Sequence, residues 1–243
     1  IVFGNNDTPG VMLSSAAKEY LKVYGVLVGR NPLIFTNNDS GYETAIEFKK
    51  NGVDSIILDT RKDPKSEIID EAKNLGIKIK FSYVVVAAKG YKKVKSADIA
   101  KISENKEELG KVENISCDCI CVSGFWTPTI HLASQSGNKT KFKEDIDAFV
   151  PGISKQNETT LGAANGSFTL AETLKSSFEA GYELSKKITK NDNMISFPNV
   201  VEKKSTVHDK FWCVPLPKGK TYKRFLDFQN DVAVSDIELA LRE

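Results

Sequence analysis

Residues at the ends of two neighbouring predicted strands could bind a dinucleotide. The stretch from Leu33 to Asp63 reads as an apolar strand, the turn Thr36 to Gly41, a helix, and a second strand ending at Asp59. In dinucleotide-binding folds such a turn holds the pyrophosphate on backbone N–H groups, and the acid takes the ribose hydroxyls. The candidate cofactor-binding residues of this stretch are Asn37, Asn38, Ser40, Gly41 and Asp59.

The same turn also has a structural interpretation. Gly41 is the only glycine in it, and the Asp39 carboxylate would repel a phosphate at short range. Asp39 or Ser40 could instead accept N–H bonds as the cap of the following helix. An acid after a strand, as at Asp59, is also a common turn residue. Two interpretations stay open: a dinucleotide site, or a degenerate Rossmann scaffold whose turn is ordered by helix capping.

A second glycine-containing turn is another candidate anion site. The residues Gly162, Ala163, Ala164, Asn165 and Gly166 precede a helix expected from about Ser167 to Ile188. The alternative is a tight strand-to-helix turn that needs small residues. The string GFWTP, which contains Gly124 and Trp126, follows an apolar strand and is either core packing or a lid over a flavin or adenine.

The cysteines and histidines give no strong sign of a metal or catalytic site. Cys117, Cys119 and Cys121 alternate, which would put three thiols on one face of a strand, and zinc sites usually use C-x-x-C pairs. We expect small buried thiols, no metal and no disulfide framework, as in a reducing cytoplasm. His131 and His208 have no acid or nucleophile grouped near them by motif, so no catalytic residue is predicted.

Composition limits the classes of function. The 243 residues suffice for one large domain or two smaller ones, and 40% hydrophobic with 27% charged residues is typical of a soluble globular protein. A net charge of +2 gives no strong attraction to nucleic acid or an anionic membrane. The chain starts at Ile1 without a Met or a signal peptide, so we expect a fragment of a longer polypeptide.

Hydrophobic periodicity predicts an α/β fold. Residues 12–24 have helical spacing, with Gly25 as the stop. From Pro32 to about Val122 the pattern predicts a β-α-β-α unit, followed by a β-meander and a closing apolar strand. After the helix at 167–188, the chain is rich in loops until a short final helix.

Six strings, in order along nearly the whole chain, resemble one family. They are VFGNNDTPGVMLSSAAKEYLKVYGVLVGR, FTNNDSGYETA, CDCICVSGFWTPTIHLASQSG, FVPG, LGAANGSFTLAETL and FLDFQNDVAVSDIELALRE. The chain with these strings resembles the α subunit of heterotetrameric sarcosine oxidase, a flavoprotein of the glutathione-reductase type with two dinucleotide folds.

The resemblance implies an oxidoreductase complex, to which this chain would contribute dinucleotide binding and subunit assembly rather than amine oxidation itself. It implies oxidative demethylation of sarcosine to glycine, with the one-carbon unit passing to tetrahydrofolate and the amine oxidised at the FAD of the β subunit. The implied cofactors are FAD, FMN and tetrahydrofolate in the complex and NAD in the full α subunit. Implied partners are the β, γ and δ subunits and the flanking parts of α, with no nucleic acid and no membrane. The chain alone is expected to be inactive, to bind no cofactor, and to self-associate through its helices 12–24 and 167–188.

The resemblance also implies a division into four parts. Residues 1–31 would belong to a first dinucleotide fold, 32–122 to an inserted Rossmann-like NAD(P)-type domain, 123–190 to the return into the first fold, and 191–243 to a linker and a degenerate small module. Gly162–Gly166 match the segment where such folds bring a helix N-terminus toward the cofactor of the first fold. Gly124, Trp126 and Pro128 match the motif just before the chain crosses back into that fold. The alternatives are a non-catalytic interaction module with a vestigial nucleotide fold, or the α subunit of a related proline or opine dehydrogenase.

Overall fold

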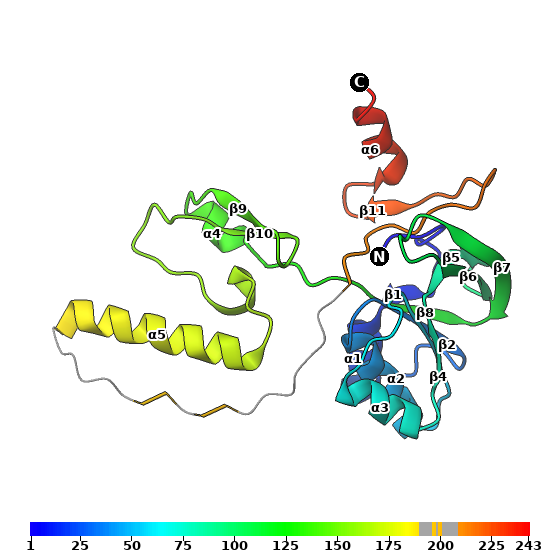
Figure 1. Ribbon diagram of the computed structural model, residues 1–243, viewed down its shortest axis with the longest axis horizontal. Coiled ribbons are helices and arrows are strands. Elements are labelled where there is room, and N and C mark those ends of the chain that lie inside the picture. The colour runs from blue at the N-terminus through cyan, green and yellow to red at the C-terminus, as the bar shows by residue number, and fades with distance from the viewer. Residues whose placement is uncertain (190–195, 198, 201–208) are drawn as a thin grey trace. The chain divides into compact units, whose positions relative to one another are not determined.

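Two units make up the chain in the computed structural model, which describes residues 1–189, 196–197, 199–200 and 209–243. The first unit is Ile1–Phe125 with Ser205–Glu243, and the second is Trp126–Lys204. Figure 1 labels their helices and strands. None of the helices in these described ranges is long and apolar enough to span a membrane.

A parallel five-stranded sheet organises the first unit. Its order is β1 (Val11–Leu13), β8 (Cys119–Ser123), β2 (Pro32–Thr36), β3 (Ile56–Asp59) and β4 (Lys78–Phe81). The chain runs outward from β2 through β3 to β4, and then returns on the other side of β2 as β8. Strand order therefore reverses between β2 and β8, the switch point where such sheets open a crevice for ligands.

Both faces of this sheet are covered. The helices α1 (Ser14–Tyr24), α2 (Ser40–Lys50) and α3 (Glu67–Asn74) lie together on one face (Figure 1). An antiparallel sheet of β5 (Tyr83–Lys89), β6 (Ser96–Ile102) and β7 (Leu109–Ser116) covers the other. Along β2, Ile34 packs with the helices, whereas Leu33 and Phe35 pack with the antiparallel sheet. This two-sided burial explains the continuous apolar runs and confirms the predicted α/β class.

The cysteines follow this layering only in part. Cys119 and Cys121 are buried on the helix side of β8. Cys117 packs on the other side, because β8 begins at Cys119 and the regular alternation starts there. The prediction that all three thiols share one face is therefore wrong for Cys117. Burial raises the pKa of the Cys117 thiol to about 12. Among the described residues, no three His, Cys, Asp or Glu side chains are grouped to hold a metal.

The C-terminal segment of the first unit packs against its N-terminus. This segment contains β11 (Phe225–Asp227), β12 (Val232–Ala233) and α6 (Val234–Ala240). Asn6 fixes it through two hydrogen bonds of 2.9 Å, from its Nδ2 to the Phe225 carbonyl and from the Phe225 N–H to its Oδ1. The predicted division into four parts stays a prediction, although β1 and α1 lie in the same sheet and helix layer as residues 32–122.

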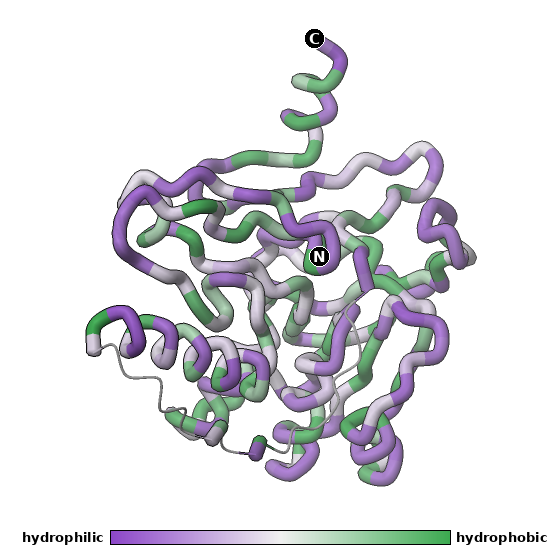
Figure 2. The backbone as a smooth tube through the Cα atoms, turned by 60° about the vertical axis from the view of Figure 1, so that its left-hand side comes forward, coloured by the Kyte–Doolittle hydropathy of each residue, from purple (hydrophilic) through white to green (hydrophobic). Residues whose placement is uncertain are grey.

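The second unit is built from short elements around a small apolar cluster. It contains α4 (His131–Gln135), β9 (Thr140–Lys143), β10 (Ala148–Pro151), the 3-10 helix η1 (Gly162–Asn165) and α5 (Leu170–Thr189). Ile146, Ala148 and Val150 form the cluster, with Phe168 packed against it. Hydrophobic and hydrophilic residues alternate along α5 (Figure 2), and no residue of this helix is buried.

Candidate functional site

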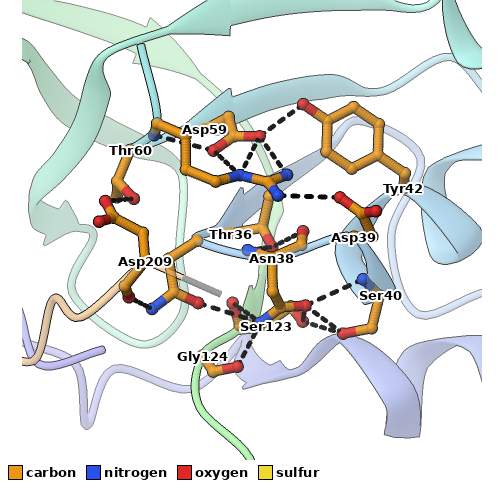
Figure 3. Close-up of polar contacts among 12 residues, drawn as sticks. Thr36, Asn38, Asp39, Ser40, Tyr42, Asp59, Thr60, Ser123, Gly124 and Asp209 are labelled. Carbon is orange, nitrogen blue, oxygen red and sulfur yellow. Dashed lines mark hydrogen bonds and ion pairs between the residues drawn. The ribbon is translucent and has the colours of Figure 1, made fainter. Parts of the chain in front are cut away.

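The carboxyl ends of β2, β3 and β8 bring part of the predicted site together. Asn37 and Asn38 follow β2, Asp59 ends β3, and Gly124 follows β8 (Figure 3). Ser40 and Gly41 open α2 at the same edge of the sheet. The predicted residues Trp126 and Gly162–Gly166 belong to the second unit. The predicted site residues of the first unit therefore lie at one edge of the sheet, whereas the others belong to a different unit.

Asp59 is fully buried, and both of its carboxylate oxygens have partners within the protein. Oδ1 accepts hydrogen bonds from the backbone N–H of Arg61 at 2.9 Å and from its Nε at 3.0 Å. Oδ2 accepts from Nη2 of Arg61 at 2.8 Å and from the Tyr42 hydroxyl at 2.6 Å (Figure 3). Charge-assisted bonds of this kind are about twice as strong as neutral ones.

One guanidinium holds two carboxylates in this interior. Nη1 of Arg61 donates to Oδ1 of Asp39 at 2.9 Å, and the Arg61 side chain is only 8% exposed. Burial acts to lower the pKa of Arg61, but hydrogen bonds and charge from Asp59 and Asp39 outweigh it and raise the pKa. Burial and the charge of Asp59 raise the pKa of Tyr42. Arg61 therefore stays a cation and Tyr42 a neutral phenol within this cluster.

Asn38, and not Asp39, orders the turn before α2. Asn38 Oδ1 accepts from the backbone N–H of Ser40 at 2.9 Å and from its hydroxyl at 2.6 Å. Asn38 Nδ2 donates to the carbonyl of Gly124. Asp39 has helical backbone angles and makes no side-chain capping bond. The predicted cap by Asp39 is therefore wrong, because its carboxylate pairs with the charge of Arg61 instead.

Gly41 has a packing role at this edge. A Cβ atom there would lie 2.6 Å from Cβ and 2.7 Å from Oγ1 of Thr36. The absent side chain lets the first turn of α2 lie directly against the end of β2. In dinucleotide folds one glycine of the phosphate-binding turn serves this close packing of helix and strand. The position therefore needs glycine whether or not a phosphate binds.

These contacts use groups that a dinucleotide would need in the position that the sequence suggests, and the binding role of these residues stays a prediction. A ribose needs acceptor oxygens on Asp59, but Arg61 and Tyr42 already bond to both. A pyrophosphate needs open N–H groups at the start of α2, but the Ser40 N–H donates to Asn38. Arg61 was missed in the sequence, although a cation two residues after a predicted strand-end acid was a usable signal.

The second turn is shaped by its backbone. Gly162 and Gly166 have positive φ angles of 65° and 80°, which favour glycine. The Gly166 N–H donates to the Ala163 carbonyl at 3.1 Å. The helix α5 begins later than predicted, at Leu170, and a cofactor contact for Trp126 or Gly162–Gly166 stays a prediction.

Curated relatives match along the chain. No protein-family model matches it. The sarcosine oxidase α subunit of Rhizobium meliloti strain 1021 is 34% identical over 256 residues, covering 100% of this chain and 23% of that protein. That of Corynebacterium sp. strain P-1 is 29% identical, covering 98% of this chain and 25% of that protein. The expected resemblance is confirmed, and the chain spans about a quarter of these relatives' length.

Solved structures share the fold at low identity. Thioredoxin reductase of Lactococcus lactis aligns with a TM-score of 0.58 and 14% identity, covering 78% of this chain and 62% of that one. An HOCl-induced flavoprotein disulfide reductase of Escherichia coli aligns with a TM-score of 0.53 and 17% identity, covering 78% and 42% of the two chains. These similarities support the flavoprotein-reductase type of fold for the chain.

Proposed function

We propose that this chain is part of the α subunit of a flavin-dependent sarcosine oxidase. The observation that carries the proposal is the 34% identity to such a subunit along the full chain. The complex would oxidatively demethylate sarcosine to glycine and pass the one-carbon unit to tetrahydrofolate. FAD, FMN and tetrahydrofolate would serve the whole complex, and NAD the full α subunit.

Within that complex the chain's contribution would be architectural. The charged and polar side chains at the sheet edge bond to one another, so they offer no ready base or nucleophile to an amine. The helix α1 exposes Tyr20, Val23 and Tyr24 by 46% to 66%. The helix α5 exposes Leu170, Leu184 and Ile188 by 59% to 73%. Exposed apolar surface of this kind often marks an interface.

The partners of these helices would be other parts of the α subunit or the β, γ and δ subunits. In isolation, the chain would bury the same apolar surfaces by self-association. Sedimentation velocity tests this with Tyr24→Lys in α1 and Ile188→Lys in α5, and with Lys220→Ala as a surface control. We expect a concentration-dependent oligomer that one of the two lysine variants weakens. A monomer at every concentration would contradict it.

Purification of the polypeptide that carries this sequence, from its source, tests the proposed activity. We expect additional subunits to co-purify and sarcosine to drive oxygen uptake with release of glycine. Tetrahydrofolate should lower the release of free formaldehyde. The 243-residue chain alone, supplied with FAD and FMN, should show no uptake. A complex that oxidises proline or an opine, and not sarcosine, would assign the chain to the related dehydrogenases instead.

A non-catalytic module with a vestigial nucleotide fold is the second candidate. The pairing of Arg61 with Asp59 and Asp39 favours it, because those contacts replace the ones that a dinucleotide would make. Titration of the chain with NAD, NADP and FAD separates this from a binding role. Binding that weakens in Ser40→Ala, with the fold intact by circular dichroism, would favour a nucleotide site at the Thr36–Gly41 turn.

A further inference from the structure

A segment from far along the chain lies at the switch point between β2 and β8. Residues Asp209–Val214, here called the strap, begin beside Asn37. Figure 3 shows Asp209 among the other residues of the site. The N–H of Asp209 donates to the Asn37 carbonyl at 3.0 Å, and Asn37 Nδ2 donates to the Asp209 carbonyl at 2.8 Å. The residue that follows β2 is thus bonded to the strap through both its backbone and its side chain.

The Asp209 carboxylate links two further elements at this edge. Its Oδ2 accepts a bond from Thr60 Oγ1 at 3.2 Å, just after β3. Its Oδ1 pairs with Lys106 in the turn between β6 and β7. Asp209 therefore joins the end of β3 to the antiparallel sheet through its side chain, and it bonds to the residue after β2 through its backbone.

Two further residues of the strap belong to the hydrophobic core. Phe211 and Val214 are buried in the cluster between the two sheets. The N–H of Val214 donates to the Val2 carbonyl at 2.8 Å, and the N–H of Val2 donates to the Trp212 carbonyl at 2.7 Å. The Trp212 ring packs on Phe125 with 4.5 Å between ring centroids. Removing the strap would expose apolar side chains and break backbone bonds together.

A cavity lies next to Arg61 and the start of the strap. A cavity of about 270 Å³ is lined by Thr60, Arg61, Lys62 and Asp209 together with Ser82, Ser103, Glu104 and Lys106. Asn38 and Asp59 do not line it. Arg61 and Asp209 line this cavity, and each bonds to a residue of the candidate site, Arg61 to Asp59 and Asp209 to Asn37.

We infer that the strap and Arg61 fill the crevice between β2 and β8 in which such folds bind a dinucleotide. The crevice here binds the chain's own Asp209 in place of a nucleotide. Arg61 takes the hydrogen bonds that a ribose would make to Asp59. The strap holds the residue after β2, where a pyrophosphate would approach. A dinucleotide could enter only by breaking both sets of contacts. This inference does not depend on the amine that the complex oxidises.

Hydrogen–deuterium exchange read by mass spectrometry tests the closure peptide by peptide. In the full polypeptide, we expect residues 36–41, 59–62 and 209–214 to exchange at the same rate with or without millimolar NAD or NADP. Slower exchange at 36–41 with faster exchange at 209–214 on adding either nucleotide would overturn the inference, because it would mean that the nucleotide displaces the strap. This local readout is independent of any dinucleotide bound elsewhere in the polypeptide.

A variant tests the role of Asp209 directly. Asp209→Ala should speed exchange of peptides 209–214 and 59–62 by about tenfold, as expected for lost hydrogen bonds to a charged group. Asp209→Asn, which keeps an acceptor oxygen, should show a smaller change, and Lys220→Ala at an exposed site should show none. Unchanged exchange in Asp209→Ala, with wild-type circular dichroism, would mean that Asp209 does not hold the strap and would overturn the inference.

Discussion

The turns at Thr36–Gly41 and Gly162–Gly166 look alike in the sequence but are stabilised differently. Each is short, ends in glycine and leads into a helix, which begins at Ser40 within the first turn and at Leu170 after the second. The first lies in a buried network in which Arg61 bonds to Asp39 and Asp59. The second is a 3-10 turn that two glycines with positive φ make possible, beside a small apolar cluster. A helix-preceding glycine thus does not by itself indicate an anion site.

The difference lies in what each turn would lose on mutation. The first turn depends on largely buried side-chain charges, so removing one partner leaves another charge unpaired. The second turn depends on backbone angles, and its neighbours are the ends of flexible side chains such as Ile146. We therefore expect large effects of mutation in the first turn and modest ones in the second.

Arg61→Ala should have the largest effect. It would leave Asp59 and Asp39 buried without their cation, at a cost of about 3–5 kcal/mol in the free energy of unfolding. Urea denaturation followed by circular dichroism measures this. Lys62→Ala, at the next position and 73% exposed, is the matched control and should change stability by less than about 0.5 kcal/mol. Equal effects of the two variants would mean that the buried network is not stabilising.

Gly41→Ala should destabilise the protein by about 1–3 kcal/mol, since the new methyl group would overlap Thr36 at the start of α2. The same substitution at Gly181, inside α5, meets no atom within 4 Å. Gly181→Ala should therefore stabilise α5 by about 0.5–1 kcal/mol. Stability changes of opposite sign for Gly41→Ala and Gly181→Ala would support the contrast between the two regions, and changes of the same sign would contradict it. Thermal unfolding of both variants provides the measurement.

Gly166→Ala should cost about 1–2 kcal/mol, because an L-residue is strained at a φ of 80°. Gly166→Asn should cost less, since asparagine tolerates left-handed angles. Hydrogen exchange in the peptides of α5 reports the stability of this unit by itself. If alanine and asparagine were equally destabilising, contact with Ile146 and not backbone strain would explain the glycine.

The pH dependence of stability should carry a contribution from Tyr42. Its pKa is raised in the folded state, so its contribution is complete below the unfolded value near 10 and is lost as pH rises above that value. One such proton gives a slope of up to about 1.4 kcal/mol per pH unit. Tyr42→Phe should show a shallower alkaline decline than wild type in urea titrations between about pH 9 and 11. Tyr91→Phe, at a side chain that is 93% exposed, should keep the wild-type slope.

The sequence by itself determined the main elements of the first unit. The apolar run at Leu33–Phe35, the helical spacing after Ser40 and the alternation in the meander depend on local periodicity, which survives in any arrangement of the elements. The resemblance to sarcosine oxidase α subunits likewise could be seen from the order of the residues alone. The sequence also showed that Gly41 is the only glycine of its turn, but not that close contact with Thr36 requires glycine there.

The contacts of the candidate site residues became visible only in the tertiary structure. Asp59 reads as a ribose acceptor until Tyr42 and Arg61 are seen to bond to both of its oxygens. Asp39 reads as a cap until the guanidinium is seen beside it. Asp209 lies 172 residues from Asn37 in the chain, and no periodicity links two such positions. Charge pairing in a dry interior depends on distances in space, and sequence spacing does not fix these distances between separate elements.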